Sequence, residues 1–322
     1  QLYMGVFRPE EYLSPLWLGN LKQYQLDYIS GVVVMTDSVG APVASSTTGF
    51  VVPDAISFWT KDSTFWSFSN RFSTSNGGTS TTCPNGGPAS DCPDGPWVEK
   101  GGVAQRLRTV WATTPTSRPI YVCNTAGTAC GTGTLSASAS IDSLACSALG
   151  VTDPECTKLR DWIRGQDNAV LADGTTSKDE NANGSITDMR ASVHGDVLHS
   201  QPAVIDYGVN GVWVFYGSND GIFHAVKGGQ GGCDTPTSTT CPGTEQWGFI
   251  ASEFYSKLKR LRDELPTINM PSKTPSEAGY ANNKPYFMDG PVGIYRDGDT
   301  VYIFPTMRRG GRSIYALNVT TP

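Results

Sequence analysis

Two stretches in the C-terminal part of the chain share one pattern of short apolar strands separated by polar turns. The expected strands lie at 202–207, 212–215 and 222–226 in the first stretch, and at 291–296, 301–304 and 313–317 in the second. Asn and Gly residues between the strands tolerate the positive φ that tight hairpin turns require. Repeated short strands of this kind are typical of the blades of a β-propeller.

The second blade is shorter than the first. A fourth strand is expected at 245–250 in the first blade, whereas the sequence ends at Pro322, where the second blade would need its own. A sheet that lacks one strand leaves an unpaired edge. We therefore expect these residues to be a fragment of a longer chain.

The rest of the pattern predicts more strands and a few short helices. Strands are expected at 17–26, 31–35, 118–123 and through the aromatic run 58–68, and helices at 96–108, from about 154 onward, and at 252–265. We predict an all-β fold, a modified and incomplete β-propeller with quinoprotein-like blades and disulfide-stapled loops. Residues 1–200 would form its N-terminal part with Cys-rich insertions, and residues 201–322 the repeated blades with the inserted helix.

Charge and hydropathy argue against two classes of partner. The 24 Lys and Arg residues are outnumbered by 30 Asp and Glu residues, and no basic cluster could neutralise the phosphates of a nucleic acid. No apolar run approaches the roughly 20 residues that a membrane-spanning helix needs. Only 17% of the residues are charged and 36 are Gly, which favours an all-β protein with many turns.

The eight cysteines fall into four close pairs in segments rich in Gly, Ser, Thr and Pro. These pairs are Cys83 with Cys92, Cys123 with Cys130, Cys146 with Cys156, and Cys233 with Cys241. An even number in local pairs predicts four disulfides, each closing one loop, formed in an oxidising compartment. The alternative is zinc held by thiolates, but no pair has CxxC spacing and no histidine lies near one. We therefore predict an exported protein.

Five motifs spread over most of the chain resemble the PilY/PilC family of type IV pilus tip proteins. They are WLGNLKQY at 17–24, EKGGVAQRLR at 99–108, DWIRGQD at 161–167 with SVHGDVLHSQP at 192–202, GSNDGIFHA at 217–225, and RGGRSIYAL at 309–317. The resemblance implies the propeller-type C-terminal domain of a cell-surface adhesin, exported through the periplasm and outer membrane to the pilus tip. It implies roles in pilus assembly, attachment and twitching, with minor pilins and a host or abiotic surface as partners. No RGD tripeptide occurs, so an integrin contact is not carried over.

One polar segment matches the opening of a calcium-binding loop, D-x-[DN]-x-[DN]-G. Its candidate ligands are Asp179, Asn181, Asn183, Ser185, Thr187 and Asp188, with Gly184 at the sharp turn. Ca²⁺ takes six to eight oxygen ligands, which side chains at positions 1, 3 and 5 of such a loop bring together. Arg190 stands where a bidentate Glu is usual, so Asp188 would have to replace it, with Glu180 as a further candidate. The family resemblance also implies a regulatory calcium loop, while the alternative is a polar turn without metal.

No catalytic motif stands out, and we predict a binding and assembly protein rather than an enzyme. The histidines His194, His199 and His224 lack metal-site or HExxH spacing, which favours structural roles. A quinoprotein dehydrogenase is the alternative with an enzymatic function, but no adjacent cysteine pair occurs. A carbohydrate-binding lectin is a further alternative. For it, Trp59, Trp66 and Trp97 could stack on sugars, although packing in the core or a loop is the simpler role for each.

Overall fold

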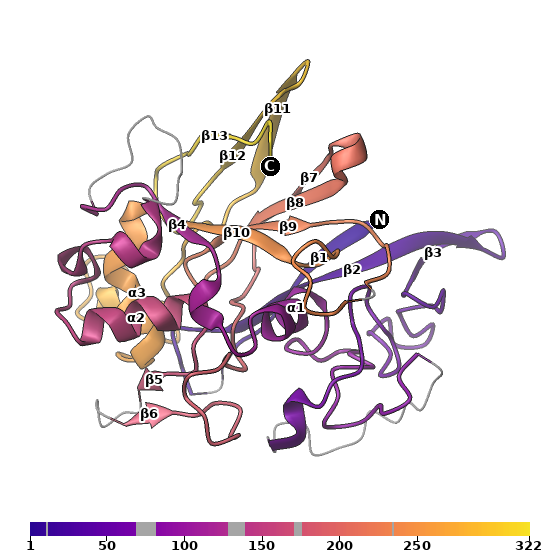
Figure 1. Cartoon of the computed structure of the whole chain (residues 1–322), viewed down its shortest axis with the longest axis horizontal. Coiled ribbons are helices and arrows are strands. Elements are labelled where there is room, and N and C mark those ends of the chain that lie inside the picture. The colour runs from indigo at the N-terminus through magenta and orange to yellow at the C-terminus, as the bar shows by residue number, and fades with distance from the viewer. Residues whose placement is uncertain (11, 69–81, 128–138, 171–175, 234) are drawn as a thin grey trace.

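The computed structural model of the chain describes residues 1–322 except 11, 69–81, 128–138, 171–175 and 234. Within the described residues, the strands form one five-stranded sheet, two three-stranded sheets and a two-stranded ribbon (Figure 1). The prediction of a mainly β fold is confirmed. Over the same residues, the sheets do not close into a barrel or a propeller.

The five-stranded sheet contains the first of the two predicted blades. Its order is β4 (Ile120–Val122), β10 (Glu245–Ile250), β9 (Phe223–Lys227), β8 (Val212–Gly217) and β7 (Ala203–Asp206). Strands β7 to β10 form an antiparallel meander, as the repeat predicted. The fifth strand, β4, pairs parallel with β10 and comes from the other half of the sequence. The sheet is therefore completed by a segment far from the repeat.

The second repeat forms a smaller sheet of β11 (Val292–Asp297), β12 (Thr300–Pro305) and β13 (Leu317–Asn318). The expected third strand at 313–317 is wrong in extent, because only Leu317 belongs to β13 and Ile314 forms one isolated bridge with Thr306. The hydroxyls of Ser313 and Tyr315 instead donate to Glu253 at 2.6 Å each. These side-chain contacts compete with regular strand pairing in this segment.

The N-terminal sheet is antiparallel and consists of β1 (Leu2–Arg8), β2 (Leu18–Ile29) and β3 (Val32–Thr36). The aromatic run 58–68, which was expected to be a strand, is not one. Phe58 makes a single bridge to Gln23, and Phe65–Phe68 form the 3-10 turn η1. The reason lies at Trp59, whose φ of 75° is incompatible with an extended chain.

Three α-helices occur in the described part of the chain: α1 (Gly102–Val110), α2 (Glu155–Arg164) and α3 (Tyr255–Asp263). Further 3-10 turns are η2 (Pro115–Ser117), η4 (Ile141–Ser143), η5 (Cys146–Leu149), η6 (Gly208–Asn210), η7 (Ser252–Phe254) and η8 (Tyr280–Asn282). All three α-helices were expected, although α1 begins later than predicted because Gly101 and Gly102 have φ of 64° and 56°. None of these helices is long and apolar enough to span a membrane.

The main core lies between the five-stranded sheet and the helices α2 and α3, which lie together near the β4 end of that sheet (Figure 1). Trp162 and Ile163 of α2 pack in one cluster with Phe215, Phe249 and Leu258. This cluster draws on residues from both sides of position 200. A two-stranded ribbon, β5 (Ala169–Val170) with β6 (Ser177–Lys178), leads from α2 to the segment with the calcium-loop pattern.

Candidate functional site

The calcium-loop segment directly follows β6 and folds back on its own backbone. Asp179 accepts hydrogen bonds from the backbone N–H groups of Asn183 (3.2 Å) and Gly184 (2.7 Å). The Asn181 Oδ1 atom accepts from the Asn183 N–H at 3.1 Å, and Asn183 Oδ1 accepts from the Ser185 N–H at 2.8 Å. Gly184 has a φ of 86°, which allows the sharp turn at position 6 of the loop.

Asp188 closes this loop from its far end. Its Oδ2 atom accepts hydrogen bonds from the side-chain amides of Asn181 (3.2 Å) and Asn183 (2.6 Å). Its Oδ1 atom is buried and has no hydrogen-bond partner. A buried carboxylate oxygen without a partner is costly, and a cation would satisfy it. Asp188 therefore lies beside Asn181 and Asn183, two of the other candidate ligands.

The other candidate ligands contact the carboxylates of Asp179 and Asp188 less directly. The hydroxyls of Ser185 and Thr187 lie 3.3 Å apart, and within the described part of the chain neither forms a hydrogen bond with a carboxylate of the loop. Glu180 points away, since its carboxylate accepts from the N–H and hydroxyl of Ser192 at 2.9 Å each. Arg190 is buried with its guanidinium 4.2 Å from the centroid of the Trp162 ring. The carboxylate, amide and hydroxyl oxygens of these residues are the type of ligand that Ca²⁺ takes, although the Oδ1 atoms of Asn181 and Asn183 also accept backbone hydrogen bonds.

Three of the predicted disulfides are present among the described residues. They join Cys83 to Cys92, Cys146 to Cys156, and Cys233 to Cys241, across separations of 9, 10 and 8 residues. Cys123 is also disulfide-bonded, while its predicted partner Cys130 lies outside the described residues. Asp62 and Asp153 each lie near one of these bridges. The neighbouring sulfurs are oxidised, so they are not thiolate ligands for a metal.

A buried network around His224 was not foreseen from the sequence. His224 Nδ1 lies 2.5 Å from Glu245 Oε2, and His224 Nε2 lies 2.8 Å from Ser218 Oγ. This is the order of a Ser–His–acid triad. However, the three residues are at most 1% exposed, and Ser218 Oγ also contacts Asp220. A substrate cannot reach Ser218 in this arrangement, so the network supports the sheet.

The same network fixes several charges inside the core. Arg118 donates to both carboxylate oxygens of Glu245, at 2.6 and 2.8 Å. Burial alone would raise the pKa of Glu245, but the charges and hydrogen bonds of Arg118 and His224 together outweigh it and the pKa is about 2. Burial, with His224 nearby, lowers the pKa of His194 to about 3. His194 is therefore neutral at pH 7, and its Nε2 atom lies 2.8 Å from the Tyr216 hydroxyl.

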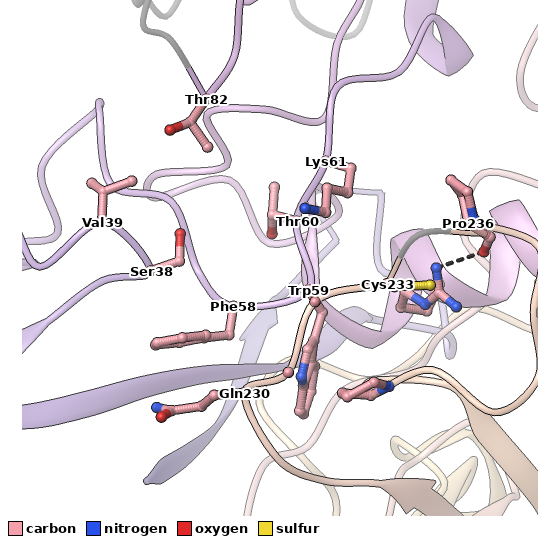
Figure 2. Close-up of a pocket in the computed structure, with 14 residues that line it drawn as sticks. Ser38, Val39, Phe58, Trp59, Thr60, Lys61, Thr82, Gln230, Cys233 and Pro236 are labelled. Carbon is pink, nitrogen blue, oxygen red and sulfur yellow. Dashed lines mark hydrogen bonds between the residues drawn. The ribbon is translucent and has the colours of Figure 1, made fainter.

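A pocket of about 260 Å³ lies between the segment 58–61 and the loop closed by Cys233 and Cys241 (Figure 2). Phe58, Trp59 and Lys61 line it from one side and Gln230 from another. Of the tryptophans considered as sugar platforms, Trp59 lines this pocket, whereas Trp66 is buried beside the guanidinium of Arg108. No spacing in the sequence indicated the pocket, because its walls come from distant segments.

Four of the motifs that resemble the pilus-tip family lie against one another. Asn20 in the first motif donates to the carbonyls of Lys100 and Gly101 in the second, at 3.2 and 2.9 Å. The Gly19 N–H donates to the His194 carbonyl at 3.2 Å. Asn219 donates to Asp196 at 2.8 Å. These segments, far apart in the sequence, form one continuous hydrogen-bonded body.

Comparisons of the chain with protein-family models, with curated proteins and with solved structures found no match. The family resemblance therefore rests on the motifs themselves and stays a prediction.

Proposed function

We propose that this protein is an exported adhesin and assembly factor of type IV pili, of the PilY/PilC kind, located at the pilus tip with minor pilins as its partners. The observation that carries the proposal is the assembly of four separate motifs around Asn20, Asp196 and Asn219. These motifs lie against one another through buried hydrogen bonds, which is compatible with a shared structural role. The disulfides are compatible with an oxidising, extracellular compartment.

The two repeated sheets would be blades of a propeller-type domain. The meander β7 to β10 has the four antiparallel strands of a blade, and β11 to β13 repeat its first part. Val292 N–H donates to the Gln201 carbonyl at 3.2 Å, so the two repeats begin side by side. Repeats that begin side by side are compatible with the radial repetition of blades in a propeller.

We further propose that the segment 179–190 holds a regulatory Ca²⁺. Asp179 and Asp188 would supply carboxylate oxygens, and Asn181, Asn183, Ser185 and Thr187 would supply neutral ones. The buried Oδ1 atom of Asp188, which has no partner, supports this assignment. With few carboxylates, the affinity should lie in the millimolar to submillimolar range of extracellular modules.

Deletion of the gene in its host, with and without complementation, tests the pilus proposal. We expect fewer surface pili, reduced twitching and weaker attachment, all restored by the complemented gene. Normal pili and normal twitching in the deletion strain would contradict the proposal.

Dye reduction by the purified protein in the presence of pyrroloquinoline quinone would favour the dehydrogenase alternative instead.

A carbohydrate-binding role is the second candidate, and the pocket beside Trp59 favours it. It is compatible with adhesion, because an adhesin can attach through a surface glycan.

A further inference from the structure

The pocket beside Trp59 is cationic in a protein that is acidic. Lys61 and Arg106 line it, and among the residues that the structure describes no Asp or Glu does so. The whole chain has a net charge of −6. Two cations on the described wall of one pocket are therefore not a consequence of average composition, and they favour an anionic ligand.

Arg106 is the more informative of these two cations, because it is only 3% exposed. Its guanidinium donates to the carbonyls of Pro236 (2.6 Å) and Ser238 (3.1 Å) and to the Thr244 hydroxyl (2.7 Å), all of them neutral. It forms no ion pair with any carboxylate in the described residues. Burial lowers the pKa of Arg106 only to about 10, so it stays charged at pH 7.

A buried charge without a counter-ion is unfavourable, and a bound anion would supply one. Nη1 of Arg106 donates one of its two N–H groups to Pro236, which leaves the other for a ligand.

Trp59 is held at the pocket wall in a strained conformation. Its φ of 75° is rare for a bulky residue. The indole Nε1 donates to the Gly229 carbonyl at 2.9 Å, and a Cβ added at Gly243 would lie 2.7 Å from the indole ring. Strain of this kind gathers at ligand sites, where the surrounding structure maintains it. The strain at Trp59 thus marks the pocket independently of its charge.

Size and lining narrow the ligand to one class. At about 260 Å³, the cavity is smaller than the roughly 300–1,000 Å³ that drug-sized ligands occupy, so it suits a single ring. The partly exposed ring of Phe58 offers an apolar face, which a bare inorganic anion would not use. Ser38 and Gln230 offer hydrogen bonds to hydroxyl groups.

We propose that this pocket binds one carboxylate-bearing sugar residue, with the carboxylate facing Lys61 and Arg106 and the sugar ring against Phe58. This deepens the proposed adhesin function by naming the class of its receptor, a glycan that carries uronate or sialate units. The binding itself needs only the purified protein.

Ligand-observed NMR or calorimetry on the whole purified chain tests the proposal, with glucuronate, N-acetylneuraminate, glucose, acetate and phosphate as probes. We expect at least one of the two acidic sugars to bind with a Kd of about 1 mM, the affinity that a ligand of this size allows. Glucose, acetate and phosphate should bind at least about tenfold more weakly. Equal binding of glucose, of acetate or of phosphate would overturn the proposal, as would no binding of either acidic sugar.

Two accessible lining residues provide the variants. Lys61→Met should weaken binding of the acidic sugar about tenfold, because a charged hydrogen bond is lost. Phe58→Ala should weaken it several-fold through loss of apolar contact. Lys158→Met and Phe50→Ala are the matched controls, since both side chains are exposed and lie outside the pocket.

All four variants should show wild-type circular dichroism. Unchanged affinity in both pocket variants would show that the sugar binds elsewhere and would refute the assignment.

The two proposals can fail separately. Sugar binding by the purified protein together with normal pili in the deletion strain would retain the pocket and reject the pilus role. Loss of pili in the deletion strain without sugar binding would do the reverse.

Discussion

The side-chain oxygen of Asn20, in β2, accepts a hydrogen bond from the backbone N–H of Ala104 at 2.9 Å, in the first turn of α1. The Asn20 amide nitrogen donates to the carbonyls of Val98, Lys100 and Gly101, at 2.9 to 3.2 Å. Gly101 stands at the N-cap position and has no side chain that could do this. One asparagine from a distant strand therefore both caps the helix and orders the segment before it.

Asn20→Ala should destabilise the protein by about 2–4 kcal/mol, because it leaves several buried backbone groups without a partner. Urea unfolding followed by circular dichroism measures this loss. Asn210→Ala, at an exposed turn, is the control and should change the free energy of unfolding by less than about 0.5 kcal/mol. A similar, small effect for both substitutions would mean that water replaces the amide of Asn20.

His194 should make the fold sensitive to acid. Its folded pKa of about 3 lies below the ordinary value of 6.5. Its neutral form therefore contributes stability that is present above pH 6.5 and is lost as the pH falls towards 3. The slope from this one group should reach at most about 1.4 kcal/mol per pH unit.

His194→Gln should flatten the dependence of the unfolding free energy on pH between 6.5 and 4. The measurement is urea unfolding at several pH values, for the wild type and the variant. The control Asn210→Ala changes a residue at an exposed turn that carries no titratable group, and it should leave the slope unchanged. If His194→Gln keeps the wild-type slope, the acid sensitivity arises from the carboxylates instead.

Much of the β architecture could be predicted from the sequence, and the failures have local causes. The strands around Phe215 and Phe249 follow apolar runs between Gly and Asn turns, and the structure has them as β8 and β10. The run through Trp59 has the same aromatic content, but its backbone is set by contacts with Gly229 and Gly243, which no local pattern reveals. Tertiary contacts overrode β propensity there.

Replacing Cys233 and Cys241 by Ser should have two effects. Opening this loop, which spans a sequence separation of 8 residues, should cost about 2–3 kcal/mol of stability. It should also weaken binding of the acidic sugar, since Cys233 and Pro236 line the pocket. Thermal unfolding and calorimetry measure the two effects.

The control is the equivalent double substitution at Cys146 and Cys156, whose separation is 10 residues and which lie outside the pocket. It should lower stability by a similar amount and leave the sugar affinity unchanged. An equal loss of affinity in both double variants would mean that the loop has no direct role in the pocket.

Calcium should raise the thermal stability of the wild type. At 10 mM Ca²⁺ and a Kd of about 1 mM, the expected gain is about 1.4 kcal/mol. Asp188→Asn should abolish this gain, because it removes the carboxylate oxygen that has no partner in the loop. Asp54→Asn, at an exposed position, should keep it. Absence of a shift in the wild type at 10 mM Ca²⁺ would contradict the calcium assignment.

The candidate calcium loop could be predicted from the sequence, whereas the pocket beside Trp59 could not. The calcium loop is contiguous, so the spacing of Asp179, Asn181 and Asn183 was enough to suggest it. The pocket joins Phe58, Arg106 and Gln230, which no short motif connects. Its cationic character depends on which carboxylates lie near Arg106, and that is a property of the folded chain alone.

The parallel pairing of β4 with β10 sets an order of events in folding. Arg118 and Glu245, which flank this pair, are 127 residues apart. Closing so long a loop is entropically expensive and slow, so this contact should form late. Until β4 pairs with β10, the outer edge of β10 remains open to pairing with a second chain. During that interval this edge is exposed to misassembly with another copy of the chain.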